Sequence, residues 1–410
     1  MTPLCAEIDF QPEAPDTLAD PFALYRRMRA EDPCHYSPRL RSWVLTRYDD
    51  IKRACQDATL SSDRMRPFFR SLPDGEQQRI GSIIRYLSTW MVFRDPPDHT
   101  RLRRLTASVF NVKAMHGMRP RVEELAAWLI ARIGERSDID FVADFAGPLP
   151  ALVIMDMLGV PRADLPLIKT LSDRIALFIG SSRTAPEKYD IAEAATHELA
   201  EFFRAMINAR RVAPAADLMS RLIGARDEAQ GDQLTEDEIV ATCILLLFAG
   251  HETTTNHIAN GMLALTRFPG EMVKLRADPG LAAGAVEELL RYDGPSGAQV
   301  RIVTVEHEMH GKTLKPGERV FMMLNSANRD ERAYRDPDTV DLGRDGVPHL
   351  TFGFGMHICL GFPLARLEGQ VAFPAVLGAF RKIEPAWERL DWISSMVFRG
   401  VHALPLRVAR

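Results

Sequence analysis

The segment from Phe352 to Gly361, which reads Phe-Gly-Phe-Gly-Met-His-Ile-Cys-Leu-Gly, constrains this chain more than any other. Its three glycines (353, 355 and 361) let the backbone turn tightly and approach a flat partner closely. A helix is predicted to begin at about Pro363, which places Cys359 next to the helix N-terminus. Backbone N–H groups and the helix dipole lower the pKa of a thiol in that position. The segment therefore predicts that Cys359 is an anionic ligand or a nucleophile.

An isolated cysteine is more often a small packed hydrophobe than a reactive group, and that alternative stays open for Cys359 taken alone. The chain has five cysteines, at 5, 34, 55, 243 and 359, and none of them forms a C-x-x-C pair. This odd, scattered set argues against a disulfide framework and a structural zinc site, and it fits a reducing cytoplasm. The Phe352 ring would cover the sulfur and keep water away from a bound metal.

Taken as a whole, the pattern F-G-x-G-x-H-x-C-x-G resembles the haem-binding loop of the cytochrome P-450 family, the haem-thiolate monooxygenases, and every fixed position is filled. The resemblance implies a mainly α fold with smaller β-sheets, in which haem b lies between a long central helix and the cysteine loop. It makes Cys359 the axial thiolate of the iron, a ligand that favours O–O cleavage. It also places Phe352, Gly353 and Gly361 at the cofactor.

The longest predicted helix begins at Thr235, which forms a capping box with Glu238, and it ends at Arg267 before Pro269-Gly270. Its length of roughly 45 Å is enough to cross the molecule, and its apolar character on all sides predicts burial. The polar segment 249–254 interrupts it. A glycine there costs about 1 kcal/mol against alanine, and a buried carboxylate costs more. Such local conflict indicates a functional site, although threonines bonded to the preceding turn would also account for it.

This segment resembles the oxygen-activation motif of the same family, A-G-x-[D/E]-T-[T/S]. By resemblance, Ala249 and Gly250 leave room for dioxygen and substrate above the haem. Thr253 contributes its hydroxyl to oxygen activation, and Glu252 relays protons from solvent, as a carboxylate with a raised pKa could. His251 fills the free position of the motif, and we interpret it as packing or as part of the proton path.

Glu288 and Arg291 stand at i and i+3 of a predicted helix, which is the order of the family's E-x-x-R motif. The resemblance implies a buried ion pair with a structural role. A third partner usually comes from a P-x-R-F-like segment, but here Pro337-Asp338-Thr339-Val340 has threonine and valine at the last two positions. Three alternatives stay open: Arg344 substitutes, Arg335 substitutes, or only the pair exists.

Haem carries two carboxylates, and the chain offers cations for them. His99 and Arg103 stand at i and i+4 of a predicted helix, and the resemblance makes them propionate ligands together with Arg301 and His357. A further hypothesis from the family's docking face is a basic patch for an acidic electron donor. Its members would be Arg101, Arg104, Lys113 and Arg366, of which Arg101 and Arg104 could equally be solvated charges.

The 410 residues carry a net charge of −4, which gives no reason to expect nucleic acid as a partner. Residues 1–15 lack the basic and apolar sections of a signal peptide, and the most apolar run, 243–250, is too short to span a bilayer. We therefore expect a cytoplasmic protein without a membrane anchor. The resemblance is to the soluble bacterial members of the family, and we expect a monomer.

No linker divides the sequence, so we expect a single domain over residues 1–410, with a β-rich N-terminal lobe and a large helical lobe. Period and turn signals predict a helix over 20–31, a helix opened by Asp49 and Asp50, and mostly helical structure over 122–225. They predict strands at 42–46, 300–305 and 319–324.

The predicted activity is insertion of one oxygen atom from O2 into an apolar C–H or C=C bond, with release of the other as water. Because no flavin domain follows in the sequence, the two electrons are expected from a ferredoxin and its NAD(P)H-dependent reductase. The alternatives are a peroxide-driven or isomerising haem-thiolate enzyme, which the retained Glu252 and Thr253 disfavour, and a haem sensor without turnover.

The substrate pocket is expected to be mostly apolar, with Ser296 and Gln299 able to orient a ligand. Arg399 could bind a substrate carboxylate or could be solvated. By resemblance, the lining comes from residues 90–93, 178–182, 246–249, 296–300 and 396–398.

Overall fold

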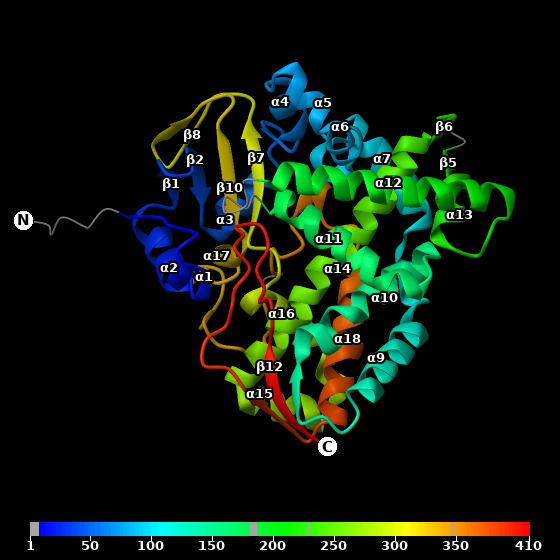
Figure 1. Cartoon of the computed structure of the whole chain (residues 1–410). Helices are drawn as coiled ribbons and strands as arrows, with labels where there is room; N and C mark the ends of the chain where they lie inside the picture. The colour runs from blue at the N-terminus through cyan, green and yellow to red at the C-terminus, as the bar shows by residue number, and fades with distance from the viewer. Residues whose placement is uncertain (1–7, 181–186, 228–229, 347) are drawn as a thin grey trace, which may run out of the picture.

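The computed structural model describes residues 8–180, 187–227, 230–346 and 348–410. The main sheet lies on one side of the molecule, at the left of the view, and the larger helices lie on the other (Figure 1). The main sheet has the strand order β1-β2-β10-β7-β3, and only the pairing of β2 with β10 is parallel. Its strands are β1 (Cys34–Ser37), β2 (Ser42–Leu45), β3 (Leu60–Ser61), β7 (Ala298–Val303) and β10 (Arg319–Met323).

Smaller sheets complete the β structure. Their strands are β4 (Asp138–Asp140), β11 (Lys382–Pro385) and β12 (Pro405–Ala409) in one sheet, β5 (Arg226–Asp227) with β6 (Asp232–Gln233) in a second, and β8 (His307–Met309) with β9 (Lys312–Leu314) in a third. The strands predicted at 42–46, 300–305 and 319–324 are confirmed as β2, β7 and β10, with shifts of one or two residues at their ends.

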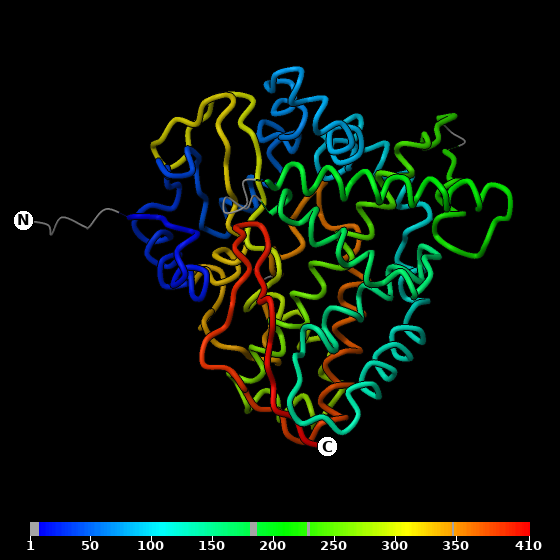
Figure 2. Tube along the Cα trace, viewed as in Figure 1, coloured from blue at the N-terminus to red at the C-terminus, as the bar shows by residue number. Residues whose placement is uncertain are grey.

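The longest helix of the described chain, α14 (Glu236–Arg267), runs through the centre of the helical side. Thr235 Oγ1 accepts from the N–H of Glu238 at 3.3 Å, and the N–H of Thr235 donates to Glu238 at 2.8 Å, which confirms the capping box. The helix is buried along most of its length and contacts α10 (Pro148–Leu158), α16 (Ala282–Asp293) and α18 (Phe362–Ala379). The trace in Figure 2 shows α14 and α18 side by side.

Other helices cover this centre and the sheet. They are α1 (Pro15–Ala19), α2 (Phe22–Glu31), α3 (Tyr48–Ala54), α4 (Met65–Arg70), α5 (Asp74–Arg79), α6 (Gly81–Tyr86), α7 (Asp98–Val109), α8 (Val112–His116), α9 (Arg119–Ile133), α11 (Leu165–Ile179), α12 (Lys188–Val212), α13 (Leu218–Gly224), α15 (Pro269–Ala277) and α17 (Leu324–Ala327). The helices predicted at 20–31 and after Asp49 are confirmed as α2 and α3. Within the part of the chain described, no helix has both the length and the apolar character needed to cross a membrane.

A buried ion network ties α16 to the segment that precedes the cysteine loop. Glu288 receives hydrogen bonds from Arg291 at 2.7 and 2.8 Å and from the side chain of Arg344 at 3.0 and 3.1 Å. The backbone N–H of Asp341 donates to the same carboxylate at 2.9 Å. The side chain of Arg335 is 95% exposed and lies 3.5 Å from Asp336, so Arg335 contributes a backbone carbonyl, which accepts from Arg344, and not its charge. Of the three alternatives left open by the sequence, the structure selects Arg344 as the third member.

Arg344→Met is expected to lower the free energy of unfolding by about 3 kcal/mol, because it leaves a buried carboxylate with one cation where it had two. Urea unfolding followed by circular dichroism measures the change. Arg335→Met removes an exposed cation nine positions earlier and serves as the control. Equal unfolding midpoints for the two variants would contradict a structural role for Arg344.

Candidate active site

The cysteine loop is folded by two glycines and one backbone hydrogen bond. Gly353 and Gly355 have φ of 72° and 73°, values that favour glycine, and a Cβ at Gly353 would lie 2.6 Å from Nε2 of Gln299. The N–H of Cys359 donates to the carbonyl of Phe352 at 2.9 Å and closes the loop. Gly361 has an ordinary φ of −85° directly before α18, so the expected special conformation is found at only two of the three glycines.

The sulfur of Cys359 faces a cavity, which leaves the residue exposed although protein surrounds it. Burial raises the pKa of the thiol, whereas the backbone N–H groups of Gly361 and Phe362 and the Arg103 guanidinium lower it. Burial dominates and the pKa is raised overall, so the lowered pKa expected from the sequence is wrong for the free thiol. A bound metal cation would reverse the balance, because a coordinating thiol is deprotonated.

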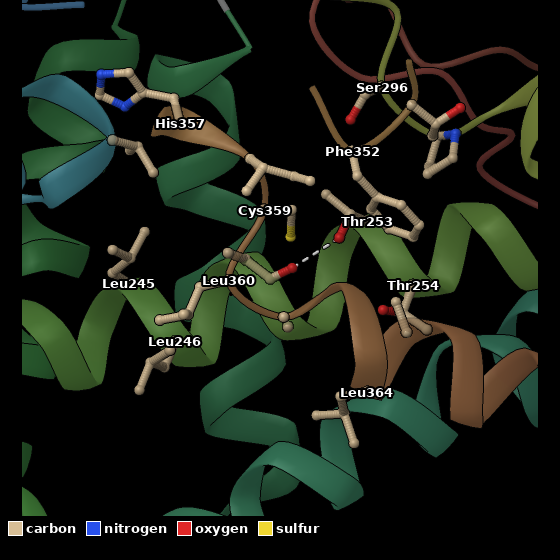
Figure 3. Close-up of a pocket in the computed structure, with 18 of the residues that line it drawn as sticks. Leu245, Leu246, Thr253, Thr254, Ser296, Phe352, His357, Cys359, Leu360 and Leu364 are labelled. Carbon is tan, nitrogen blue, oxygen red and sulfur yellow. Dashed lines mark hydrogen bonds between the residues drawn. The ribbon is translucent and has the colours of Figure 1, made fainter. Parts of the chain in front are cut away.

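The middle of α14 forms the opposite wall of the same cavity. Thr253 and Thr254 line it across from Cys359, Phe352 and Leu360 (Figure 3). Thr253 Oγ1 donates to the carbonyl of Ala249 at 2.8 Å, so the back-bonding foreseen as an alternative does occur, but at the cavity wall. The two motifs therefore face one space. Ala249, Gly250 and Gly361 also line it.

Gly250 has a packing role that the sequence did not indicate. A Cβ at this position would lie 3.3 Å from Cγ1 of Ile154 on α10, a tight contact. The glycine thus permits close approach of α10 to α14 in addition to lining the cavity.

Glu252 lies at an acidic contact between α14 and α11. Burial raises the pKa of Glu252 to about 8, and the negative charge of Asp173 and a hydrogen bond to it act in the same direction. The positive charge of Lys169 acts in the opposite direction. Lys169 Nζ is 3.2 Å from Asp173, whose side chain is half exposed. Asp173 therefore connects Glu252 with the surface, and sequence reasoning missed it because nothing in α11 marks this carboxylate.

His251 is buried against this group. Its Nδ1 lies 3.6 Å from Oε1 of Glu252, and burial lowers the pKa of His251 to about 4. The ring is therefore neutral at pH 7, which agrees with packing and leaves a part in proton transfer as an untested prediction.

The four residues predicted to bind haem carboxylates lie together. The rings of His99 and His357 are 4.1 Å apart, and Ser62 Oγ lies 3.0 Å from Nε2 of His357. Burial and the charge of Arg301 lower the pKa of His357 to about 3, with His99 and Arg103 contributing in the same direction. Arg301 is buried, and its guanidinium donates to the carbonyl of Val300 at 3.1 Å. At pH 7 the positive charge of this group therefore comes from the guanidinium groups of Arg103 and Arg301, and the His357 ring is neutral.

The predicted donor patch is a different case, because most of its cations are neutralised. Arg101 pairs with Glu238 and Asp232, and Arg104 pairs with Asp227. Arg366 pairs with Glu287 at 2.6 Å. These three cations are therefore paired within the chain, and the docking of an acidic electron donor on this patch stays a prediction.

The predicted pocket segments are divided between two cavities. Met91, Val92, Leu246, Ser296 and Gln299 line the cysteine cavity. Phe178, Val300 and Met396 line a second one, and residues 181 and 182 lie outside the described chain.

Arg399 is buried, where its Nε donates to Asp293 at 2.5 Å and a terminal nitrogen donates to the carbonyl of Leu18 at 2.7 Å. It is therefore a structural residue, and both interpretations offered for it are wrong.

Two buried titratable residues at the cavity were not predicted. Burial lowers the pKa of His257 to about 3 and raises that of Glu368 well above its ordinary value. Both residues line the cavity, His257 from α14 and Glu368 from α18. The available signal was that Glu368 is the single carboxylate of α18.

The family model for cytochrome P450 matches residues 39–279 and 280–390. This chain belongs to the cytochrome P450 family. The cyclomarin C epoxidase CymV of Salinispora arenicola is 37% identical to this P450 over 92% of the chain and 93% of the relative. The vitamin D(3) 25-hydroxylase of Pseudonocardia autotrophica is 35% identical to it, over 94% of this chain and 93% of the relative.

The fold agrees with solved P450 structures. The myxobacterial CYP267B1, determined in complex with myristic acid, has a TM-score of 0.86 and 37% identity, and the match covers 97% of this chain and 99% of that one. The predicted mainly α fold with small sheets is thereby confirmed. This P450 is an oxidoreductase of a family whose bacterial members include an epoxidase and a hydroxylase, and the family implies a haem cofactor.

The cysteine cavity fits a haem by two further observations. Neither ring nitrogen of buried His99 has a hydrogen-bond partner in the described chain. Among the described residues, no carboxylate pairs with the guanidinium of Arg103 or of Arg301. Burial lowers the pKa of both guanidinium groups, which marks an environment that needs a counter-ion. The two carboxylates of a haem would provide it.

Proposed function

We propose that this P450 is a haem-thiolate monooxygenase that hydroxylates or epoxidises an apolar small molecule. One observation carries the proposal: Cys359 lines a single cavity from one side, and Ala249, Gly250, Thr253 and Thr254 of α14 line it from the other. That arrangement provides an iron ligand on one wall and the hydroxyl groups of Thr253 and Thr254 on the other, while Glu252 lies on the same helix against Asp173 of α11. The proposed domain is single and spans residues 1–410.

Each residue has a defined task in the proposal. Cys359 would hold the iron of haem b through its thiolate, and His99, Arg103, Arg301 and His357 would bind the haem carboxylates. When bound, haem supplies the iron at which O2 is reduced and one of its oxygen atoms is transferred to the substrate. Phe352, Gly353 and Gly361 would shape the wall on the cysteine side of the haem, and the small residues Ala249 and Gly250 would leave space on the opposite side.

Proton supply is assigned to α14 and α11. Glu252 holds a proton at neutral pH because its pKa is raised to about 8. After it has donated that proton, it can be reprotonated from the surface through Asp173. Thr253 lines the cavity, and its hydroxyl, which donates to the carbonyl of Ala249 in this structure, would be available there as a hydrogen-bond donor.

The electron donors in the proposal are a ferredoxin and its NAD(P)H-dependent reductase, which rests on the resemblance to bacterial members of the family. The test is NADH consumption with a surrogate ferredoxin and reductase, followed by detection of an oxygenated product. A ferrous–carbon monoxide spectrum without the far-red-shifted Soret band would contradict the thiolate assignment. Reduction without any oxidised product across a broad substrate panel would favour a haem sensor.

Thr253→Ala is expected to leave haem content unchanged while diverting electrons to hydrogen peroxide. Loss of one neutral hydrogen bond, about 1 kcal/mol, should lower the ratio of product to NADH roughly fivefold. Thr266→Ala is a matched control, because Thr266 lies on the same helix and donates a similar hydrogen bond of 2.7 Å to a backbone carbonyl, that of Leu263 three residues earlier. Thr266 does not line the cavity. Equal coupling in both variants would refute the role of Thr253.

A further inference from the structure

A second cavity, of about 480 Å³, lies beside the main sheet, and the mechanism above does not use it. Its volume is within the range of pockets that hold small molecules. The wall is mostly apolar and includes Phe68 of α4, Phe178 of α11, Phe321 of β10 and Met396. Such a wall fits a hydrocarbon portion of a ligand.

Two guanidinium groups face this apolar space. Among the described residues, Arg64 and Arg319 have no hydrogen-bond or ion-pair partner for their side chains. Arg64 lies over the ring of Phe93 at 4.7 Å and is half-buried, whereas Arg319 is exposed. The remaining charged residues of the lining, Glu13 and Lys188, are engaged in interactions of their own.

The surroundings of Arg64 are unfavourable for a cation. Burial and the like charges of Arg301 and Arg319 lower the pKa of Arg64 to about 10. The group stays protonated at pH 7, so an anion placed between Arg64 and Arg319 would relieve the repulsion and gain charge-assisted hydrogen bonds.

Strand β7 relates this cavity to the cysteine cavity. Side chains alternate along a strand, and Val300 and Ile302 line the second cavity whereas Gln299 lines the first. Arg319 pairs with Ile302 in the register of β10 with β7, which places both on the same face. Residues 90–93 form another shared wall, because Met91 and Val92 line the cysteine cavity while Phe93 packs under Arg64.

We propose that this cavity binds the carboxylate of an elongated apolar acid, with Arg64 as the principal anchor and Arg319 as a secondary one. The proposal rests on the proposed monooxygenase function and narrows its substrate class. The acid group stays at the cation pair, and the hydrocarbon chain extends along the apolar wall toward the shared strand.

The test compares decanoic acid with 1-decanol, which share a hydrocarbon chain and differ in the charged head. Isothermal titration calorimetry on the haem-loaded protein at pH 7.5 measures both affinities without turnover. The parent should bind the acid roughly tenfold or more tightly than the alcohol, as expected for a hydrogen bond to a charged group. Arg64→Gln should remove most of this preference, Arg64→Lys should keep part of it, and Arg319→Gln should have a smaller effect.

Arg335→Gln removes a cation that is 95% exposed and remote from the lining, so it should leave the preference unchanged. Equal affinities of the parent for acid and alcohol would overturn the proposal. An unchanged preference in Arg64→Gln would also overturn it, and so would a loss of haem by that variant, which would assign Arg64 to the haem carboxylates. Failure of the monooxygenase function would appear separately, in the carbon monoxide spectrum.

Discussion

Cys359→Ala is expected to abolish the far-red-shifted Soret band of the ferrous–carbon monoxide complex and all product formation. The sulfur is the one thiol that lines the cavity in the described chain, so no other cysteine can replace it as a ligand without refolding. Absorbance of the reduced protein under carbon monoxide measures the outcome directly. Haem binding itself should weaken but persist, because the cluster around Arg301 is unaffected.

Cys34→Ala is the control for this experiment. Cys34 is buried in a separate hydrophobic cluster beneath the main sheet, and its replacement should leave the spectrum unchanged. An alanine variant at 359 with the parent's spectrum would remove Cys359 as the ligand.

Glu252→Gln is expected to lower the rate of product formation about 100-fold, a typical contribution of a positioned proton donor. The parent should lose activity as the pH rises through about 8, because the carboxyl group must carry its proton in order to donate it. The glutamine variant has no such group, so this decline should disappear. Turnover measured between pH 6 and pH 9 checks both effects, because this range extends at least roughly one pH unit on either side of the pKa of Glu252.

Two further variants sharpen the assignment. Glu236→Gln changes an exposed carboxylate in the first turn of the same helix and should leave the pH profile unchanged. Asp173→Asn removes the charge that helps to raise the pKa of Glu252, so the decline should move to lower pH. A pH profile that is identical in the parent and in Glu252→Gln would exclude this carboxyl group as the donor.

Local patterns were sufficient to predict much of the site. The capping box at Thr235, the helix that follows it and the loop around Cys359 depend on neighbouring residues, and the structure contains all three. The prediction that segment 249–254 and the cysteine loop lie on opposite sides of one cavity rested on the family resemblance. Local sequence patterns do not indicate which distant segments lie close together in the fold.

Ion pairing shows where sequence reasoning stops. The choice of Arg344 over Arg335 depends on the path of the loop after Pro337, and the pairing of Arg101 with Glu238 depends on how α7 lies against the start of α14. Arg399 and Asp293 illustrate the same point. A charged side chain takes whichever partner the tertiary structure brings near, and the sequence alone does not reveal that neighbour.

The alternation along β7 has an evolutionary consequence. Substitutions at 300 and 302 alter the wall of the second cavity, while Gln299 and Arg301 on the other face stay as they are. In the proposed roles, selection on ligand preference and selection on cofactor retention would act on different residues of one strand. A lineage can explore new ligands by changing one face without putting the other at risk.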